Sequence, residues 1–190
     1  MTQDSYQKTI EKIDEFYKIG NQQKSFDECL PLFFNIFEVG NEYREELNVI
    51  FILADIGDGI FSKDKSNDGK LGLKEFKNLI EKIPEDKSDK ERLFAETIFN
   101  SLGKKQPYIS KSQFKTLFDI MTFTQDTKKL IIEEINPEIK SSAWKEYLNY
   151  YGEKDGVFND VFNIVAEDRK ESREKVITLE RFISWYNNCC

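Results

Sequence analysis

The chain has 190 residues, of which 39% are hydrophobic and 33% charged, and its net charge at neutral pH is −7. This is enough apolar material for a folded core, and the negative charge has the wrong sign for neutralising the phosphates of a nucleic acid. The sequence contains no histidine. Catalysis by Ser-His-Asp or Cys-His groups and zinc sites with histidine ligands are therefore excluded. Since no Gly-rich phosphate loop is present either, we expect no enzyme.

The cysteines and the chain ends indicate a protein of a reducing compartment. The three cysteines, Cys29, Cys189 and Cys190, form neither a disulfide framework nor a zinc-binding spacing. The first residues lack the basic start and apolar run of a signal peptide, and no apolar stretch is long enough to span a membrane. The last two cysteines are not part of a CaaX box and follow no basic cluster. We expect a cytoplasmic protein without membrane contact.

Apolar residues recur mostly at three- and four-residue spacing, and glycine and proline are scarce, which predicts an all-α fold. About ten helices are predicted, at residues 3–18, 26–38, 41–62, 73–83, 89–101, 111–122, 126–135, 137–151, 155–167 and 178–188. Two starts have the spacing of a capping box, Ser88 with Glu91 and Ser110 with Gln113.

One apolar pattern repeats along the chain. Phe76, Leu79 and Ile80 have the spacing 0, +3, +4. The same spacing recurs at Phe114, Leu117 and Phe118, at Trp144, Tyr147 and Leu148, and at Phe182, Trp185 and Tyr186. The repetition indicates four to five helix–loop–helix units in a single domain over residues 1–190, with a division into lobes of about 1–84 and 85–190 as an option.

The segment 64–75 carries the chemistry. Oxygen-bearing side chains stand at loop positions 1, 3, 5 and 12, and glycine stands at position 6, where the chain must turn sharply. Calcium takes six to eight oxygens at once, whereas magnesium prefers a tighter octahedral shell. The predicted ligands are the side chains of Asp64, Ser66 and Asp68, the backbone carbonyl of Lys70, a water beside Gly72, and both carboxylate oxygens of Glu75.

This segment resembles the EF-hand. Leu71 stands at position 8, where EF-hand loops place an aliphatic residue in a short strand that pairs with a partner loop, and Ile56 and Ile60 precede Asp64 by eight and four residues. The resemblance implies a calcium site and a paired loop, for which we expect the loop that starts at residue 102. Three acidic and three lysine side chains leave the loop formally neutral, so we expect a dissociation constant on the order of 10⁻⁶ to 10⁻⁴ M.

The other loops are predicted to be empty. In 102–113, Lys104 stands at position 3 and Gln113 closes the loop, and in 170–181 lysine and arginine stand at the two ends. The unit around 18–30 has no acidic pair at ligand spacing. The segment 123–155 reads either as a decayed unit or as an inserted helical hairpin.

Five units would leave the last one without a partner in the chain. That arrangement resembles the penta-EF-hand family and implies a homodimer through the last unit. A more distant resemblance, through size, acidity and sparse working loops, is to grainins, which implies association with granules or vesicles. The function expected is that of a calcium sensor or buffer with a protein partner. The alternative is a calcium-independent helical scaffold for protein interaction or dimerisation, because aromatic residues gather around Trp144 and Trp185.

Overall fold

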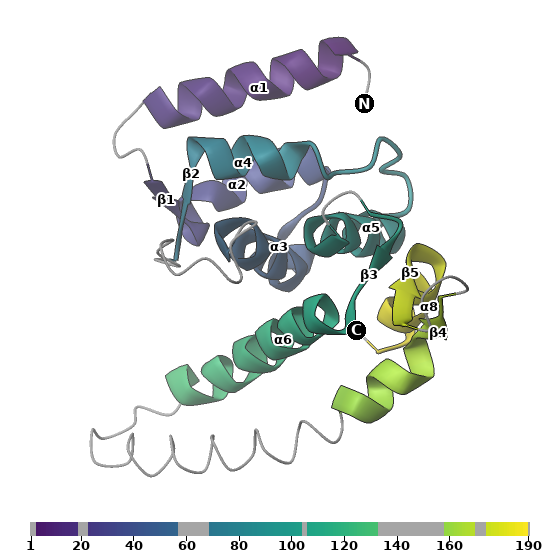
Figure 1. Cartoon of the computed structure of the whole chain (residues 1–190). Helices are drawn as coiled ribbons and strands as arrows, with labels where there is room; N and C mark the ends of the chain where they lie inside the picture. Colours follow the sequence, from purple (N-terminus) through teal and green to yellow (C-terminus); the bar gives the residue numbers. More distant parts are fainter. Residues whose placement is uncertain are drawn as a thin grey trace. The chain divides into compact units, whose positions relative to one another are not determined.

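The structure is a computed structural model that describes residues 3–18, 23–56, 69–103, 106–132, 158–169 and 174–189. The chain forms two compact units, one of residues 1–106 with 186–190 (unit 1) and one of residues 107–185 (unit 2) (Figure 1). The division lies beyond the boundary near residue 84 that the sequence suggested, because α5 (Lys90–Gly103) packs against α3 (Arg44–Ile56) within unit 1.

Unit 1 contains two helix–strand–helix repeats followed by α5. The first repeat consists of α1 (Gln3–Lys18), β1 (Gln23–Ser25) and α2 (Phe26–Phe37). After the short 3-10 helix η1 (Asn41–Tyr43), the second repeat consists of α3, β2 (Lys70–Gly72) and α4 (Leu73–Ile80). The strands β1 and β2 pair antiparallel with Lys24 opposite Leu71, which joins the two repeats (Figure 1).

The core of unit 1 is built from phenylalanines on facing helices. Phe33 of α2 is fully buried and stacks on Phe76 of α4, with ring centroids 5.1 Å apart. Phe51 of α3 meets Phe33 edge-on at 6.4 Å. Phe37 stacks on Phe94 of α5 at 5.4 Å. The Phe33–Phe76 stack places α4 against α2, and α4 also contacts α1 and α3, so its position is fixed by packing rather than by its own eight residues.

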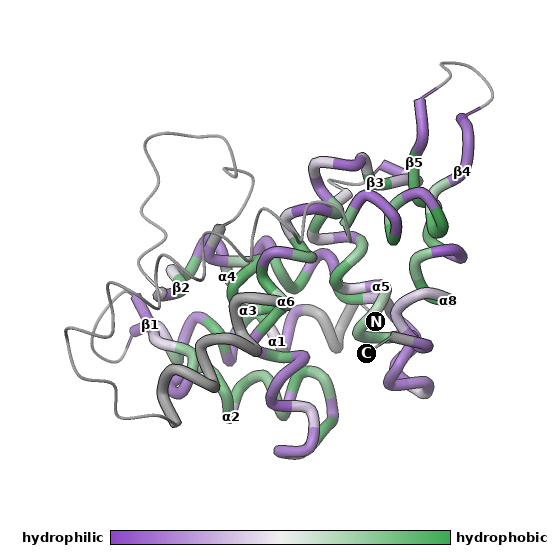
Figure 2. Tube along the Cα trace, turned by 90° about the horizontal axis from the view of Figure 1, so that it is seen from below, coloured by the Kyte–Doolittle hydropathy of each residue, from purple (hydrophilic) through white to green (hydrophobic). Residues whose placement is uncertain are grey.

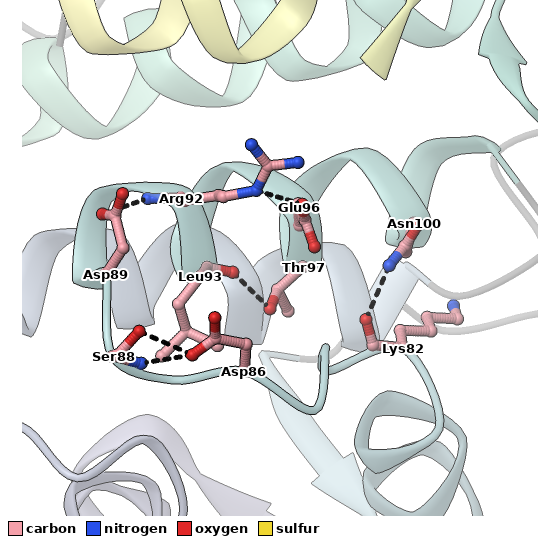
Figure 3. A network of polar contacts seen from close by, with 9 residues as sticks. All are labelled: Lys82, Asp86, Ser88, Asp89, Arg92, Leu93, Glu96, Thr97 and Asn100. Atoms are coloured by element: carbon pink, nitrogen blue, oxygen red, sulfur yellow. Dashed lines mark hydrogen bonds and ion pairs between the residues drawn. The ribbon is translucent and has the colours of Figure 1, made fainter. Parts of the chain in front are cut away.

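The connection that leads into α5 is fixed by side-chain hydrogen bonds (Figure 3). Asp89 accepts the Arg92 N–H at 3.0 Å and so caps α5, whereas the hydroxyl of Ser88 donates to Asp86 at 2.6 Å. The prediction of a capping box at Ser88 is therefore wrong, because the N-cap residue of α5 is Asp89, one residue later. Further along the helix, the amide of Asn100 donates to the carbonyl of Lys82 at 2.9 Å.

Unit 2 contains the rest of a third repeat, which begins with α5, and most of a fourth. The third repeat is completed by β3 (Tyr108–Ile109) and α6 (Lys111–Ile132). The fourth consists of a helix at residues 158–165, the strands β4 (Glu167–Asp168) and β5 (Lys175–Thr178), and α8 (Leu179–Cys189), of which residues 186–189 belong to unit 1. The strands form one antiparallel sheet in the order β3-β5-β4, with Ile109 opposite Ile177. Phe114 of α6 is fully buried among Phe158, Phe162 and Trp185, at centroid distances of 6.0, 6.3 and 4.8 Å.

The structure is mostly helical, as predicted, but it corrects four predictions made from the sequence. Two small antiparallel sheets accompany the helices. The helices predicted at 111–122 and 126–135 are one continuous helix, α6, so residues 123–132 form no loop. The helix predicted to end at residue 167 ends at residue 165, and residues 167–168 form the strand β4. The partner of the 64–75 loop is the first loop of the chain and not the loop at 102, which pairs with the loop at 170.

This pairing removes the reason to expect a dimer through an unpaired last unit, because β5 has β3 as its partner in the same chain. The predicted helix at 137–151, with Trp144, lies outside the described residues. In Figure 2 apolar and polar residues alternate along the helices, which is typical of amphipathic helices that pack on a core. None of the described helices is both long and apolar enough to cross a bilayer.

Candidate metal centre

The second half of the predicted loop begins at a glycine in the left-handed region. Gly69 has a φ of +71°, a conformation that costs glycine little and strains side chains with a Cβ. This is loop position 6, where the sequence required the sharp turn. A Cβ built on Gly69 would meet no atom within 4 Å, so the requirement for glycine comes from the backbone angle and not from crowding.

Beyond the turn, the loop becomes a strand. Leu71 at position 8 is fully buried in β2 opposite Lys24 of β1. The backbone of Lys70, whose carbonyl is a predicted ligand, stands at the exposed start of this strand opposite Ser25. The paired strand therefore fixes the direction of the chain at the position where the Lys70 carbonyl is needed.

Glu75 stands at the third residue of α4 and turns back toward the loop. Its Oε2 accepts the N–H of Gly72 at 2.8 Å, which satisfies a backbone donor at the helix start. A Cβ on Gly72 would lie 3.3 Å from the same oxygen. The closing carboxylate is thus held beside the loop by the local geometry of the helix start.

The remaining predicted ligands, Asp64, Ser66 and Asp68, lie outside the described residues. Within the described part of the chain, no three Cys, Asp or Glu side chains lie close enough together to hold a metal ion. The described half of the loop fits a hard cation in kind, because it offers a left-handed glycine, a backbone carbonyl in a fixed strand and a carboxylate at the helix start.

Two side chains from other elements hold this half-loop, and sequence reasoning missed both. The hydroxyl of Tyr17, at the end of α1, donates to the carbonyl of Leu71 at 2.8 Å in a buried contact. The carboxylate of Asp55, near the end of α3, accepts the N–H of Gly69 at 3.1 Å. Their signal in the sequence is weak, since each is one polar residue at the end of an otherwise apolar helix face.

Tyr17 belongs to a buried polar group beside the loop. Burial raises the pKa of its hydroxyl above the ordinary range, and neighbouring Cys29 and Glu75 raise it further. Burial likewise raises the pKa of the Cys29 thiol to about 12. Both groups are therefore neutral at physiological pH, and the Tyr17 hydroxyl retains the proton that it donates to Leu71.

The strand register shows which residue occupies each position of the first loop, which the sequence alone did not show. Because Lys24 lies opposite Leu71, Lys24 occupies position 8, and the loop runs from Tyr17 to Glu28. Its position 12 is therefore a glutamate, whose Oε2 accepts the Ser25 N–H at 2.9 Å, and this hydrogen bond lowers the pKa of Glu28. Tyrosine at position 1 and isoleucine at position 3 offer no carboxylate, so the loop lacks a calcium ligand set.

The loops of unit 2 use their closing residues in other ways. Gln113 accepts the Ser110 N–H at 2.7 Å, which confirms the predicted capping box. Arg181 instead donates to Glu167 at 3.0 Å and to the carbonyl of Val165 at 3.2 Å. An amide and a guanidinium therefore stand where a calcium loop needs a carboxylate.

Neither a family model nor a curated protein matches this chain.

Proposed function

We propose that the chain is a calcium-binding protein of the EF-hand kind, with one working loop at residues 64–75, and that it acts as a calcium sensor or buffer. The observation that carries the proposal is the agreement at three places of the described half-loop. Gly69 has the left-handed turn, Leu71 has the paired strand, and Glu75 has the carboxylate at the helix start. A twelve-residue calcium loop of this kind has its glycine turn at position 6 and its closing glutamate at position 12, and the EF-hand resemblance implies the paired strand at position 8.

The chemistry of binding follows from the places of the donors. Asp64, Ser66 and Asp68 would supply side-chain oxygens, Lys70 its carbonyl, and Glu75 two carboxylate oxygens. One of the Glu75 oxygens accepts the Gly72 N–H at 2.8 Å. A cation that takes both carboxylate oxygens would therefore compete with Gly72 for this oxygen. The competition couples the occupancy of the loop to the start of α4.

The sensor version of the function acts through α4. Phe76 directly follows Glu75, is fully buried, and contacts Phe33 at 5.1 Å and Tyr17 at 6.1 Å. A rotation of α4 that follows Glu75 would therefore change the packing of this face and offer it to a protein partner. In the buffer version α4 keeps its place, and the near-UV dichroism of the chain is unchanged by calcium.

The test is a calorimetric calcium titration of the wild type, Glu75→Gln and Glu28→Gln. The two glutamates stand at the same loop position and make the same capping bond, at 2.8 and 2.9 Å, so the second variant controls for damage to a helix start. We expect one site in the wild type, its loss or strong weakening in Glu75→Gln, and full retention in Glu28→Gln. An unaffected titration in Glu75→Gln would contradict the proposal.

A further inference from the structure

The incoming helices of the first and third loops end at the same place relative to their strands. Counting back seven residues from the residue at position 8 gives Tyr17 in the first loop and Leu102 in the third. Each is the last residue but one of its helix as described, α1 ending at Lys18 and α5 at Gly103. Both are buried, at 6% and 2% exposure.

In α3 the corresponding residue is Asp55. It is the last but one of the helix, which ends at Ile56, and it is only 5% exposed. The residues four places earlier also match, since Ile13, Phe51 and Ile98 are all buried. Asp55 therefore occupies in α3 the place that begins the loop in α1 and α5.

Counting from the strand gives a different first residue for the second loop. Seven residues before Leu71 is Asp64, whereas Asp55 lies sixteen residues before Leu71. The segment from Asp55 to Leu71 is thus nine residues longer than the matching segments of the first and third loops. Such an insertion is tolerated because the entropy cost of closing a loop grows only slowly with its length.

A hydrogen bond joins the two sides of the insertion. The carboxylate Oδ2 of Asp55 accepts the N–H of Gly69 at 3.1 Å, across fourteen residues of chain. The acceptor is buried and charged when ionised, and the donor belongs to the left-handed turn at position 6. Hydrogen bonds to a charged group are stronger than neutral ones, and removing the Asp55 carboxylate frees the N–H of the exposed Gly69 to exchange with solvent.

We propose that Asp55 is the positioning residue of the calcium loop: it stands where the first and third loops begin and holds the Gly69 turn against α3. The effect on calcium rests on the proposed function, whereas the anchoring of the turn does not. Holding Gly69 fixes the start of β2, and with it the carbonyl of Lys70 and the approach to Glu75. Residues that orient ligands in this way typically change metal affinity about 10- to 100-fold when replaced.

The experiment measures the Asp55–Gly69 hydrogen bond and calcium binding separately, both on the full chain. Amide hydrogen exchange of Gly69 is measured by NMR in EGTA for the wild type, Asp55→Ala, Asp55→Asn and Asp64→Ala, and each is then titrated with calcium. Asp55→Asn keeps the shape and an acceptor oxygen, so it serves if the alanine variant does not fold.

We expect the Gly69 amide to be protected in the wild type and Asp64→Ala, to exchange at least roughly tenfold faster in Asp55→Ala, and to be intermediate in Asp55→Asn. Calcium affinity should fall about 10- to 100-fold in Asp55→Ala. Unchanged exchange in both Asp55 variants, or loss of protection in Asp64→Ala alone, would overturn the inference. A wild type that binds no calcium overturns the proposed function and the role of Asp55 in binding, while the exchange data still decide the anchor.

Discussion

The hydroxyl of Tyr17 and the carbonyl of Leu71 are joined by a buried 2.8 Å hydrogen bond that links the first repeat to the strand of the second. Leu71 is the central residue of β2, and Tyr17 begins the first loop by the strand register. A residue of the first loop is thereby a support of the loop that we propose to bind calcium. The two loops form one structural pair, held by backbone bonds between β1 and β2 and by this side chain.

Tyr17→Phe removes the hydroxyl and leaves a buried carbonyl without this donor. We expect the free energy of unfolding to fall by about 1–3 kcal/mol, because the cost of an unsatisfied buried acceptor adds to the lost bond. Urea denaturation in EGTA measures the change. Tyr43→Phe is the matched control, since it also deletes a hydroxyl in unit 1 but retains the ring stacked on Phe94 at 5.1 Å. Equal losses in the two variants would contradict this role for the Tyr17 bond.

A neutral side chain at position 75 should still accept the hydrogen bond that caps α4. Gln113 makes the same bond to the backbone N–H three residues earlier, at 2.7 Å, so a glutamine at position 75 should cap α4 equally well. In EGTA we expect Glu75→Gln to unfold within about 0.5 kcal/mol of the wild type, and Glu75→Ala to lose about 1 kcal/mol. Thermal and urea unfolding check both values. A large loss in Glu75→Gln would mean that the charge itself stabilises the helix start.

Phe33 is the centre of the aromatic core of unit 1. It is fully buried and contacts Phe76 at 5.1 Å and Phe51 at 6.4 Å. Phe33→Ala should cost about 3–5 kcal/mol through lost burial and the cavity left behind, with a smaller loss for Phe33→Leu. Ile164, which is 77% exposed, provides the control, because Ile164→Ala should change stability by less than about 0.5 kcal/mol. Urea unfolding followed by far-UV dichroism gives the comparison.

Cys29 makes stability depend on pH above neutrality. Burial raises the pKa of its thiol from 9.0 to about 12, so the unfolded chain loses this proton first as the pH rises. The thiol therefore stabilises the fold fully below pH 9, and this contribution is lost between about pH 9 and pH 12, with the loss reaching about 1 kcal/mol at pH 10. The raised pKa of Tyr17 acts in the same direction.

The contribution of the thiol is the difference between two unfolding series, one of the wild type and one of Cys29→Ala, from pH 8 to pH 10. The cavity left by alanine lowers stability at every pH, whereas only the wild type carries the slope from the thiol. Parallel curves for the two proteins would show that Cys29 titrates normally in the folded state.

Local patterns in the sequence predicted most helices, because apolar periodicity and capping residues act within one element. The helices at 3–18 and 26–38 and the cap at Ser110 are confirmed by α1, α2 and the Gln113 bond. The partner of the 64–75 loop was predicted wrongly, because pairing of distant loops is decided by helix packing that a local pattern does not contain. The first loop was missed as a partner since its position 8 is a lysine, Lys24, and not an aliphatic residue.

A better signal for the first loop was present in the sequence. Ser25 and Glu28 have the same three-residue spacing as Ser110 and Gln113, and both pairs form capping boxes directly after a paired strand. The role of Asp55 had no such signal. The oxygen pattern of 64–75 is complete by itself and places the loop start at Asp64, so only a contact across fourteen residues draws attention to Asp55.

The pairing of β1 with β2 also shapes the response that the proposed calcium loop would give. Two metal sites joined by a strand pair are able to fill together and to respond steeply to concentration. Here the partner begins with Tyr17, which contributes a hydroxyl to its neighbour and no carboxylate of its own. With one cation per pair, occupancy follows a simple hyperbola, and passing from one-tenth to nine-tenths filled takes about an 80-fold rise in free calcium. Such a protein would report calcium as a graded level and not as a threshold.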